Sequence, residues 1–200
     1  MTHVRDGGRQ VNGLRVPGVH VERRKKLPED EATALYPHYE RTFGPLRTAA
    51  AARHVLSLEE FVEDMADERI DKWVATDGEG NFLGLSILVT DLAAVPWASA
   101  EFYAARHPEH VARGAVWYLG FTMTIPGEQG GGIFATMLTA MMEAAVDEQV
   151  IVAWDMCEAN VRAGLNDGIM GMLLKGAGAP SIQVDTQTYF TADFGVGAAS

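Results

Sequence analysis

Three consecutive glycines, Gly130 to Gly132, form the stretch of the sequence best suited to chemistry. They follow an apolar run from Ala115 to Ile125 that predicts a buried strand, which Pro126 and Gly127 would end. Because glycine has no side chain, a bulky anion can approach its backbone N–H group closely. The unpaired N–H groups of a following helix, together with its dipole, would face that anion. The stretch therefore predicts a phosphate-binding turn, although a triple glycine is equally typical of a tight turn without a ligand.

The residues after Gly132 have the period of a helix. Two adjacent stripes carry its apolar side chains: Ile133, Met137, Met141 and Ala145 on one, and Phe134, Leu138 and Met142 on the other. The stretch is not the nucleotide P-loop, because no Gly-Lys-Ser/Thr follows, nor the dinucleotide fingerprint, because the order Gly-x-Gly-x-x-Gly is absent. We therefore expect a strand, a glycine-rich turn and a helix in a different phosphate-binding context.

The order Gln/Arg-x-x-Gly-x-Gly/Ala does fit residues 129–134, with a strand and a proline before them. This order resembles motif A of the GNAT superfamily of acyl-CoA-dependent N-acyltransferases. The resemblance implies that the loop amides hold the pyrophosphate of coenzyme A (CoA). Phe134 departs from the pattern, in which the last position is small. The cofactor-binding residues implied here are Gln129, Gly130, Gly131, Gly132, Ile133 and Phe134.

A second resemblance lies at Asn160 to Ala163, which is similar to the Asn-x-x-Ala that opens the next helix in GNAT proteins. It implies that Asn160 binds the pantetheine arm of CoA. A helix N-cap is the alternative role of this asparagine. Relatives often place a tyrosine three or four residues after the alanine, as the acid for the leaving thiolate. Here Asn166 and Asp167 stand at those positions, so the usual acid is missing.

Tyr118 is the candidate catalytic residue. It stands eleven residues before Gln129, where histone-type relatives carry a glutamate base. A phenol with a pKa of about 10 is a poor base at neutral pH but could serve as an acid or orient water. An aromatic ring half-buried in the sheet is the alternative.

The resemblance also implies that a backbone N–H at a bulge of the preceding strand polarises the thioester carbonyl. That bulge is expected at Met123, Thr124 and Ile125. Three further residues near the turn and the next strand end were considered for proton relay or covalent chemistry, each with a solvated or structural alternative: Glu128, Cys157 and Glu158.

Hydrophobic periods and turn residues predict the helices and strands in the rest of the chain. They predict strands at 19–22, 71–76, 82–89, 150–156 and 181–192, helices at 28–42 and 57–67, and a partly helical segment over the substrate cleft at 93–114. The order implies an α/β fold of GNAT type, with a mixed, mostly antiparallel central sheet flanked by helices. In that fold, the strands beside the first cofactor helix splay apart around the cofactor.

Length and composition fit one domain at 19–193, with flexible tails at 1–18 and 194–200. Of the 200 residues 48% are hydrophobic, and the net charge is −11. Residues 1–26 hold seven Arg or Lys and two acids, which leaves nine bases and 25 acids in the rest. Such an acidic body argues against nucleic-acid binding and weakly favours a cationic amine.

Other features exclude further classes of protein. No apolar run approaches the roughly 20 residues of a membrane span. A lone cysteine, Cys157, provides no disulfide framework, so a cytoplasmic location is expected. His107 and His110 lack a third ligand nearby, so no metal site is expected.

These expectations combine into one function and one alternative. The function is an N-acyltransferase that transfers an acetyl or other short acyl group from acyl-CoA directly to a small-molecule amine. The alternative is a catalytically silent GNAT-like module that binds acyl-CoA as a sensor or partner domain. A fold-only relative without a cofactor is a third alternative, and a homodimer stays open.

Overall fold

The computed structural model describes residues 14–52, 54–127, 130–164, 171–176, 178–179 and 181–191. Its centre is a five-stranded sheet whose strands lie side by side in chain order. The strands are β1 (His20–Arg24), β2 (Ile70–Thr76), β3 (Phe82–Val89), β4 (Val116–Thr124) and β5 (Ile151–Ala153). Neighbours from β1 to β4 are antiparallel, and β4 pairs with β5 in parallel. The expected mixed, mostly antiparallel sheet is confirmed.

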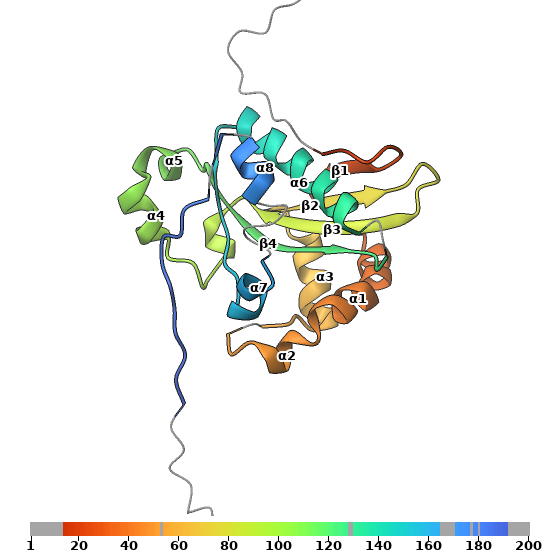
Figure 1. Cartoon of the computed structure of the whole chain (residues 1–200), viewed down its shortest axis with the longest axis horizontal. Coiled ribbons are helices and arrows are strands. Elements are labelled where there is room, and N and C mark those ends of the chain that lie inside the picture. Colours follow the sequence, from red (N-terminus) through yellow and green to blue (C-terminus); the bar gives the residue numbers. More distant parts are fainter. Residues whose placement is uncertain are drawn as a thin grey trace, which may run out of the picture.

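Helices cover both faces of this sheet. They are α1 (Glu29–Phe43), α2 (Leu46–Ala49), α3 (Leu58–Ala66), the 3-10 helix η1 (Leu92–Ala94), α4 (Ala100–Arg106), α5 (Pro108–Ala112), α6 (Gly130–Asp147), α7 (Glu158–Arg162) and α8 (Gly171–Gly176). Figure 1 shows α6 and α8 on one side of the sheet, α1 and α3 on the other, and α4 and α5 beyond one end. The expected partly helical segment before β4 is therefore confirmed as η1, α4 and α5.

Local sequence signals account for the start of α3 and for the β2–β3 hairpin. The Ser57 hydroxyl accepts from the Glu60 N–H (3.2 Å), and the Glu60 carboxylate accepts from the Ser57 N–H (2.7 Å). This confirms the predicted capping box. In the hairpin turn, one Asp77 oxygen accepts from the N–H groups of Glu79 (2.9 Å) and Asn81 (2.8 Å). These bonds hold the turn that sets the pairing of the two strands.

Helix α6 packs closely on the sheet through its predicted apolar stripe. Ile133 and Met137 are buried against the sheet. A Cβ at Gly84 of β3 would lie 2.8 Å from the Met137 sulfur and 2.8 Å from the Met123 carbonyl oxygen. A side chain at position 84 would therefore push α6 away, so this glycine permits the close approach of helix and sheet. The other face is filled by a cluster of aromatic rings from α1, α3 and β4: Tyr36, Tyr39, Phe43, Phe61 and Phe121.

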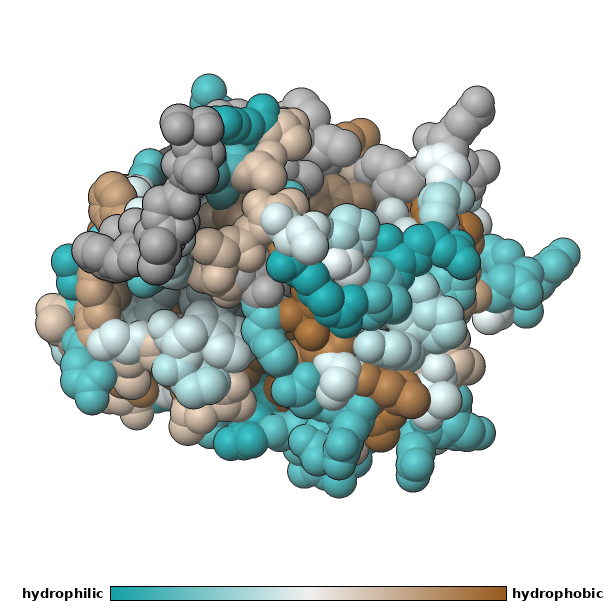
Figure 2. Space-filling view, turned by 90° about the horizontal axis from the view of Figure 1, so that it is seen from below, coloured by the Kyte–Doolittle hydropathy of each residue, from teal (hydrophilic) through white to brown (hydrophobic). Residues whose placement is uncertain are grey.

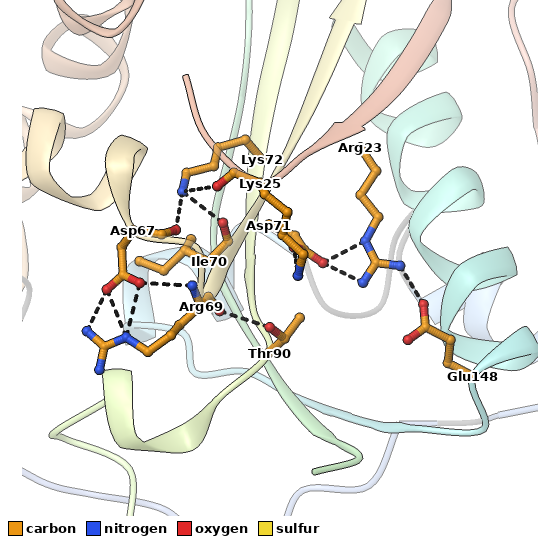
Figure 3. A network of polar contacts seen from close by, with 9 residues as sticks. All are labelled: Arg23, Lys25, Asp67, Arg69, Ile70, Asp71, Lys72, Thr90 and Glu148. Carbon is orange, nitrogen blue, oxygen red and sulfur yellow. Dashed lines mark hydrogen bonds and ion pairs between the residues drawn. The ribbon is translucent and has the colours of Figure 1, made fainter. Parts of the chain in front are cut away.

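Two neighbouring charges of β2 are fully buried, and each has partners (Figure 3). The Asp71 carboxylate pairs with Arg23 (2.5 Å) and Lys25 (2.6 Å), and Arg23 also pairs with Glu148 at the end of α6. These ion pairs join β1 to β2 and to α6. A buried carboxylate is tolerated only with such partners.

The Lys72 ammonium donates to three backbone carbonyl groups, those of Lys25 (3.0 Å), Asp67 (2.6 Å) and Ile70 (2.8 Å). Three acceptors match the three N–H groups of an ammonium. Burial nevertheless lowers the pKa of Lys72 to about 8, against the opposing effect of Asp67 and Asp64. The site therefore holds a charge that the interior disfavours.

The two chain ends differ from expectation. The predicted strand at 181–192 is wrong, because residues 181–191 form neither helix nor strand. Ile182 and Phe190 are 79% and 89% exposed. The apolar residues alternate as they would in a strand, but none of the described strands pairs with this segment. Figure 1 shows it extending away from the sheet and helices.

At the other end, residues 14–16 lie along α6, although a flexible tail was expected through residue 18. The Val16 N–H donates to the Thr136 hydroxyl (2.9 Å), and the Thr139 hydroxyl donates to the Leu14 carbonyl (3.2 Å). Residues 1–13 and 192–200 lie outside the described part of the chain. In that part, no helix is long and apolar enough to cross a membrane.

Candidate active site

A gap opens between β4 and β5 directly after Tyr118. The parallel pairing covers three pairs, from Val116 with Ile151 to Tyr118 with Ala153. There β5 ends, whereas β4 continues to Thr124. The β4 backbone from residue 119 onwards therefore has no strand partner on that side among the described residues. The splayed strands expected around the cofactor are confirmed.

Tyr118 is the last β4 residue that pairs with β5, so it lies where the gap begins. Its ring is buried, and its hydroxyl donates to Asp155 Oδ1 at 2.7 Å. Burial, the hydrogen bond to Asp155 and the charge of that carboxylate together raise the pKa of Tyr118 well above its usual value. The phenol is therefore protonated at physiological pH. This excludes Tyr118 as a base and leaves it as an acid or a positioning group.

The sequence did not single out Asp155. It is exposed and lies two residues after the last residue of β5. The only sequence signal is that it is the first charged residue after the apolar run that begins at Val150. Its proximity to Tyr118, 37 positions earlier, arises from the parallel pairing of β4 and β5.

Two aromatic residues from the segment before β4 lie near this pair: Trp97 contacts the Tyr118 ring, and Tyr103 lies within reach of the charge of Asp155. The Trp97 ring lies edge-on to the Tyr118 ring, with centroids 6.3 Å apart, and is 66% exposed. Tyr103 lies on α4, whose start is capped by Ser99, with the Ser99 hydroxyl accepting from the Phe102 N–H at 3.1 Å. Burial first, and then the charge of Asp155, raises the pKa of Tyr103.

The bulge of β4 falls at Gly120, so the predicted position at Met123 to Ile125 is wrong. Consecutive β3 residues Ile87 and Leu88 face Phe121 and Leu119, which leaves Gly120 as the extra residue. A Cβ at position 120 would lie 2.7 Å from the Ile87 side chain. The bulge forms there because glycine alone leaves room for Ile87.

The three residues expected to face the thioester are therefore part of regular pairing. Met123 pairs with Leu85, Thr124 pairs with Gly84, and the Ile125 N–H donates to the Leu83 carbonyl at 2.9 Å. The Ile125 amide is thus already used. Because neighbouring strand residues point their N–H groups to opposite sides, the Thr124 amide faces the gap instead.

The glycines belong to α6, which begins at Gly130 rather than after Gly132. The backbone N–H groups of this first turn have no acceptor within the helix, as at every helix start. Ile133 contributes only its backbone there, because its side chain is in the core. Gln129 and Glu128 lie outside the described residues. A helix start of this kind can bind an anion such as a pyrophosphate.

Two contacts at the start of α6 were not foreseen. A Cβ at Gly132 would lie 2.7 Å from Val16 Cγ2, so the N-terminal segment that runs along α6 lies directly against this glycine. Phe134, the departure from the motif, is half-buried and packs against a cluster formed by Ala135, Leu138 and Met142. A large side chain is tolerated at position 134 because this apolar cluster covers part of it.

Helix α7 begins at Glu158 with Cys157 as its N-cap, so the alternative of Asn160 as an N-cap is wrong. Asn160 is the third helical residue, half-buried, and its N–H donates to the Cys157 carbonyl (3.0 Å). The exposed Glu158 carboxylate pairs with exposed Arg162 (2.5 Å). This surface ion pair accounts for Glu158 without a role in proton relay. Asn166 and Asp167 lie outside the described residues.

The chemistry that these groups can perform is acid–base and hydrogen-bonding chemistry. Within the described residues, no group of three or more His, Cys, Asp and Glu side chains could hold a metal ion. The gap offers a protonated phenol, a carboxylate, backbone donors of β4 and two aromatic rings. Figure 2 shows the face of the molecule seen from below, where hydrophobic residues form patches among hydrophilic ones.

Comparisons with known proteins identify the fold. No protein-family model matches the sequence. No curated protein matches it either. Several solved structures do match.

One is an aminoglycoside acetyltransferase from an uncultured soil metagenomic sample, in complex with sisomicin, with 11% identity and a TM-score of 0.51 over 88% of this chain and 97% of that one. A ribosomal-protein-alanine N-acetyltransferase from Brucella melitensis biovar Abortus 2308 has 13% identity and a TM-score of 0.50, over 88% and 99% of the two chains. A mutant protein from Bacillus halodurans has 15% identity and a TM-score of 0.52, over the same shares. The chain has the fold of the GNAT acetyltransferases.

Proposed function

We propose that the protein transfers an acyl group from acyl-CoA, most simply acetyl-CoA, to the amine of a small molecule. The observation that carries this proposal is the gap after Tyr118, because Leu119 on one side of it and Trp154 and Met156 on the other pack against the same face of α6, the helix that begins with the three glycines. The fold shared with acetyltransferases supports it. One neighbour is crystallised with the small molecule sisomicin, which supports a small-molecule acceptor.

Acyl-CoA would supply an activated thioester carbonyl to this site. The first-turn amides of α6, at Gly130 to Gly132, would hold its pyrophosphate, and Asn160 on α7 its pantetheine arm. The Thr124 amide would donate to an oxygen in the gap. These groups bind and orient, which is the larger part of what direct transfer between two bound substrates requires.

Proton movement falls to the pair of Tyr118 and Asp155. In direct transfer the new C–N bond forms as the C–S bond breaks, the amine loses one proton and the thiolate gains one. The raised pKa of Tyr118 keeps its hydroxyl protonated throughout. The single O–H of Tyr118 donates to Asp155, so Tyr118 would position that carboxylate, which can accept the proton that the amine loses, and Tyr118 could donate to the thiolate only after leaving this bond.

The test uses calorimetric binding of CoA to the wild type and to two variants of one glycine. Gly132→Ala and Gly132→Asp both add a Cβ that meets Val16. Only Asp adds a carboxylate that repels the pyrophosphate. We expect Gly132→Asp to bind CoA at least about 10-fold more weakly than Gly132→Ala, which corresponds to about 1.4 kcal/mol. Equal affinity of the two variants would contradict the assignment of the cofactor site.

The second candidate function is a module that binds acyl-CoA without transfer. The observation in its favour is the absence of the usual thiolate acid, because Asn166 and Asp167 occupy its positions. Release of free thiol, measured with a panel of amines and acetyl-, propionyl- and longer acyl-CoA, separates the two functions. CoA binding without amine-dependent thiol release would favour the silent module.

A further inference from the structure

We propose that the acceptor enters as an ammonium ion, which the Asp155 carboxylate binds while the aromatic rings of Trp97 and Tyr103 contact it. The ammonium loses one proton to solvent, which reaches the exposed Asp155, before its nitrogen attacks, and the second proton, lost as the C–N bond forms, balances the one that the thiolate gains. Asp155 would then determine specificity for cationic amines. This inference rests on the proposed function, because it names the substrate class of the same gap. It adds a recognition role for three residues that no family motif covers.

The first support is the position and state of Asp155. It is exposed to solvent, so a ligand can reach it, and the Tyr118 hydroxyl fixes one of its oxygens at 2.7 Å. A carboxylate offers about four acceptor positions, so it can accept from an ammonium group while keeping the bond from Tyr118. A hydrogen bond between charged groups is roughly twice as strong as one between neutral groups.

The second support is the pair of aromatic residues. Trp97 exposes two-thirds of its surface beside Tyr118, which is unusual for so large an apolar side chain. Tyr103 lies close enough to Asp155 for that charge to raise its pKa. Aromatic faces attract cations, by about 0.5–1 kcal/mol at exposed sites, and tryptophan does so best. The carboxylate and the rings therefore favour the same kind of group.

The third support is that Tyr118 brings no charge of its own. Its raised pKa keeps the phenol neutral, so the carboxylate of Asp155 is not matched by a second anion from the tyrosine. A neutral phenol and a carboxylate bind an ammonium ion better than they bind an anion. The strongly acidic chain after residue 26 attracts cations over a longer range as well.

The test compares a cation with a neutral molecule of nearly the same shape. Phenethylamine and 2-phenylethanol share an aromatic ring and a two-carbon chain, and differ in the ammonium and hydroxyl groups. Binding of each to the full chain is measured by calorimetry at pH 7, with and without CoA. We expect phenethylamine to bind at least about 10-fold more tightly, and the difference to shrink at high salt.

Variants assign the effect to the residues. Asp155→Asn keeps an oxygen for the Tyr118 hydroxyl but removes the charge. It should therefore weaken the binding of phenethylamine by about 10-fold and leave the binding of 2-phenylethanol unchanged. Asp147→Asn removes an exposed carboxylate at the end of α6 and serves as the matched control. Trp97→Leu keeps an apolar side chain without a π face, and should weaken phenethylamine by about 2- to 5-fold. Trp97 is exposed, so this variant should fold.

Two results would overturn the inference. One is equal binding of the amine and the alcohol by the wild type. The other is an Asp155→Asn variant that binds phenethylamine like the Asp147→Asn control. Failure of the proposed function is distinguishable, because it is the lack of CoA binding and thiol release. If thiol release proceeds equally well with neutral or anionic acceptors and with Asp155→Asn, the acyltransferase proposal stands and the ammonium site fails.

Discussion

The buried Lys72 provides a prediction about stability and pH. Its ammonium is fully buried, donates to three carbonyl groups and has a pKa lowered to about 8 by burial. In the unfolded chain the pKa of a lysine is about 10.4. Between these two values the unfolded state binds more protons than the native state. The free energy of unfolding therefore rises with pH in this window, because alkali removes a proton that the interior disfavours.

The size of the effect follows from the two pKa values. From pH 7 to pH 9.5, the proton linkage of a group with pKa values of about 8 and about 10.4 adds about 2 kcal/mol to the free energy of unfolding. Below pH 7 both states hold the proton and the contribution is constant. Above pH 10 other groups titrate, including Tyr118, whose raised pKa acts in the opposite direction.

The measurement is urea unfolding at intervals between pH 7 and pH 9.5. Wild type is compared with Lys72→Met, which lacks the titrating group, and with Lys26→Met, which removes an exposed lysine paired with exposed Glu68. Lys72→Met leaves three carbonyl groups without their donor, which lowers stability at every pH. The informative quantity is therefore the slope of the free energy of unfolding against pH.

We expect wild type and Lys26→Met to gain about 2 kcal/mol across this range relative to Lys72→Met. Parallel curves for all three proteins would refute the reasoning, because they would mean that Lys72 has the same pKa in the native and unfolded states. They would also mean that the three carbonyl groups drawn in Figure 3 and the nearby acids fully offset the effect of burial on the ammonium.

Two further predictions concern the candidate site. Tyr118→Phe keeps the buried ring and removes the bond to Asp155, so turnover should fall by about 10- to 100-fold while CoA affinity is unchanged; unaltered kcat would leave Tyr118 as core only. Asn160→Ala should weaken CoA by about 10-fold at constant melting temperature, because Cys157 and not Asn160 caps α7. A lower melting temperature with unchanged CoA affinity, measured by scanning and titration calorimetry, would assign Asn160 to structure instead.

Local patterns in the sequence predicted much of the fold. The capping box at Ser57, the β2–β3 hairpin, and the strand before and the helix after Pro126 are confirmed, whereas Gly130 to Gly132 belong to the helix and not to a turn before it. Each depends on residues within a few positions of one another, such as a side chain bonding to a backbone group of the next turn. Such interactions depend on the local sequence and not on the segments that pack around it.

Pairing partners were decided only by the tertiary structure. The segment at 181–191 has the alternation of a strand, but none of the strands that the structure describes pairs with it, and a strand without a partner leaves its backbone groups to water. The bulge of β4 lies at Gly120 because of the Ile87 side chain on the neighbouring strand. The lack of pairing at 181–191 and the position of the β4 bulge both depend on neighbouring strands. Neither could be predicted from the spacing of apolar residues along the segment itself.

The candidate site shows the same division. The sequence by itself determined that Tyr118 lies in a buried strand before a glycine-rich helix start, because apolar runs and glycines are local signals. It could not determine that Asp155 and Trp97 approach the hydroxyl. Parallel pairing carries Asp155 to the end of β5 beside Tyr118, and the chain before α4 brings Trp97 there from the other side. These residues meet because the sheet fixes which distant segments are neighbours, and Asp155 then adds to the effect of burial in raising the pKa of Tyr118.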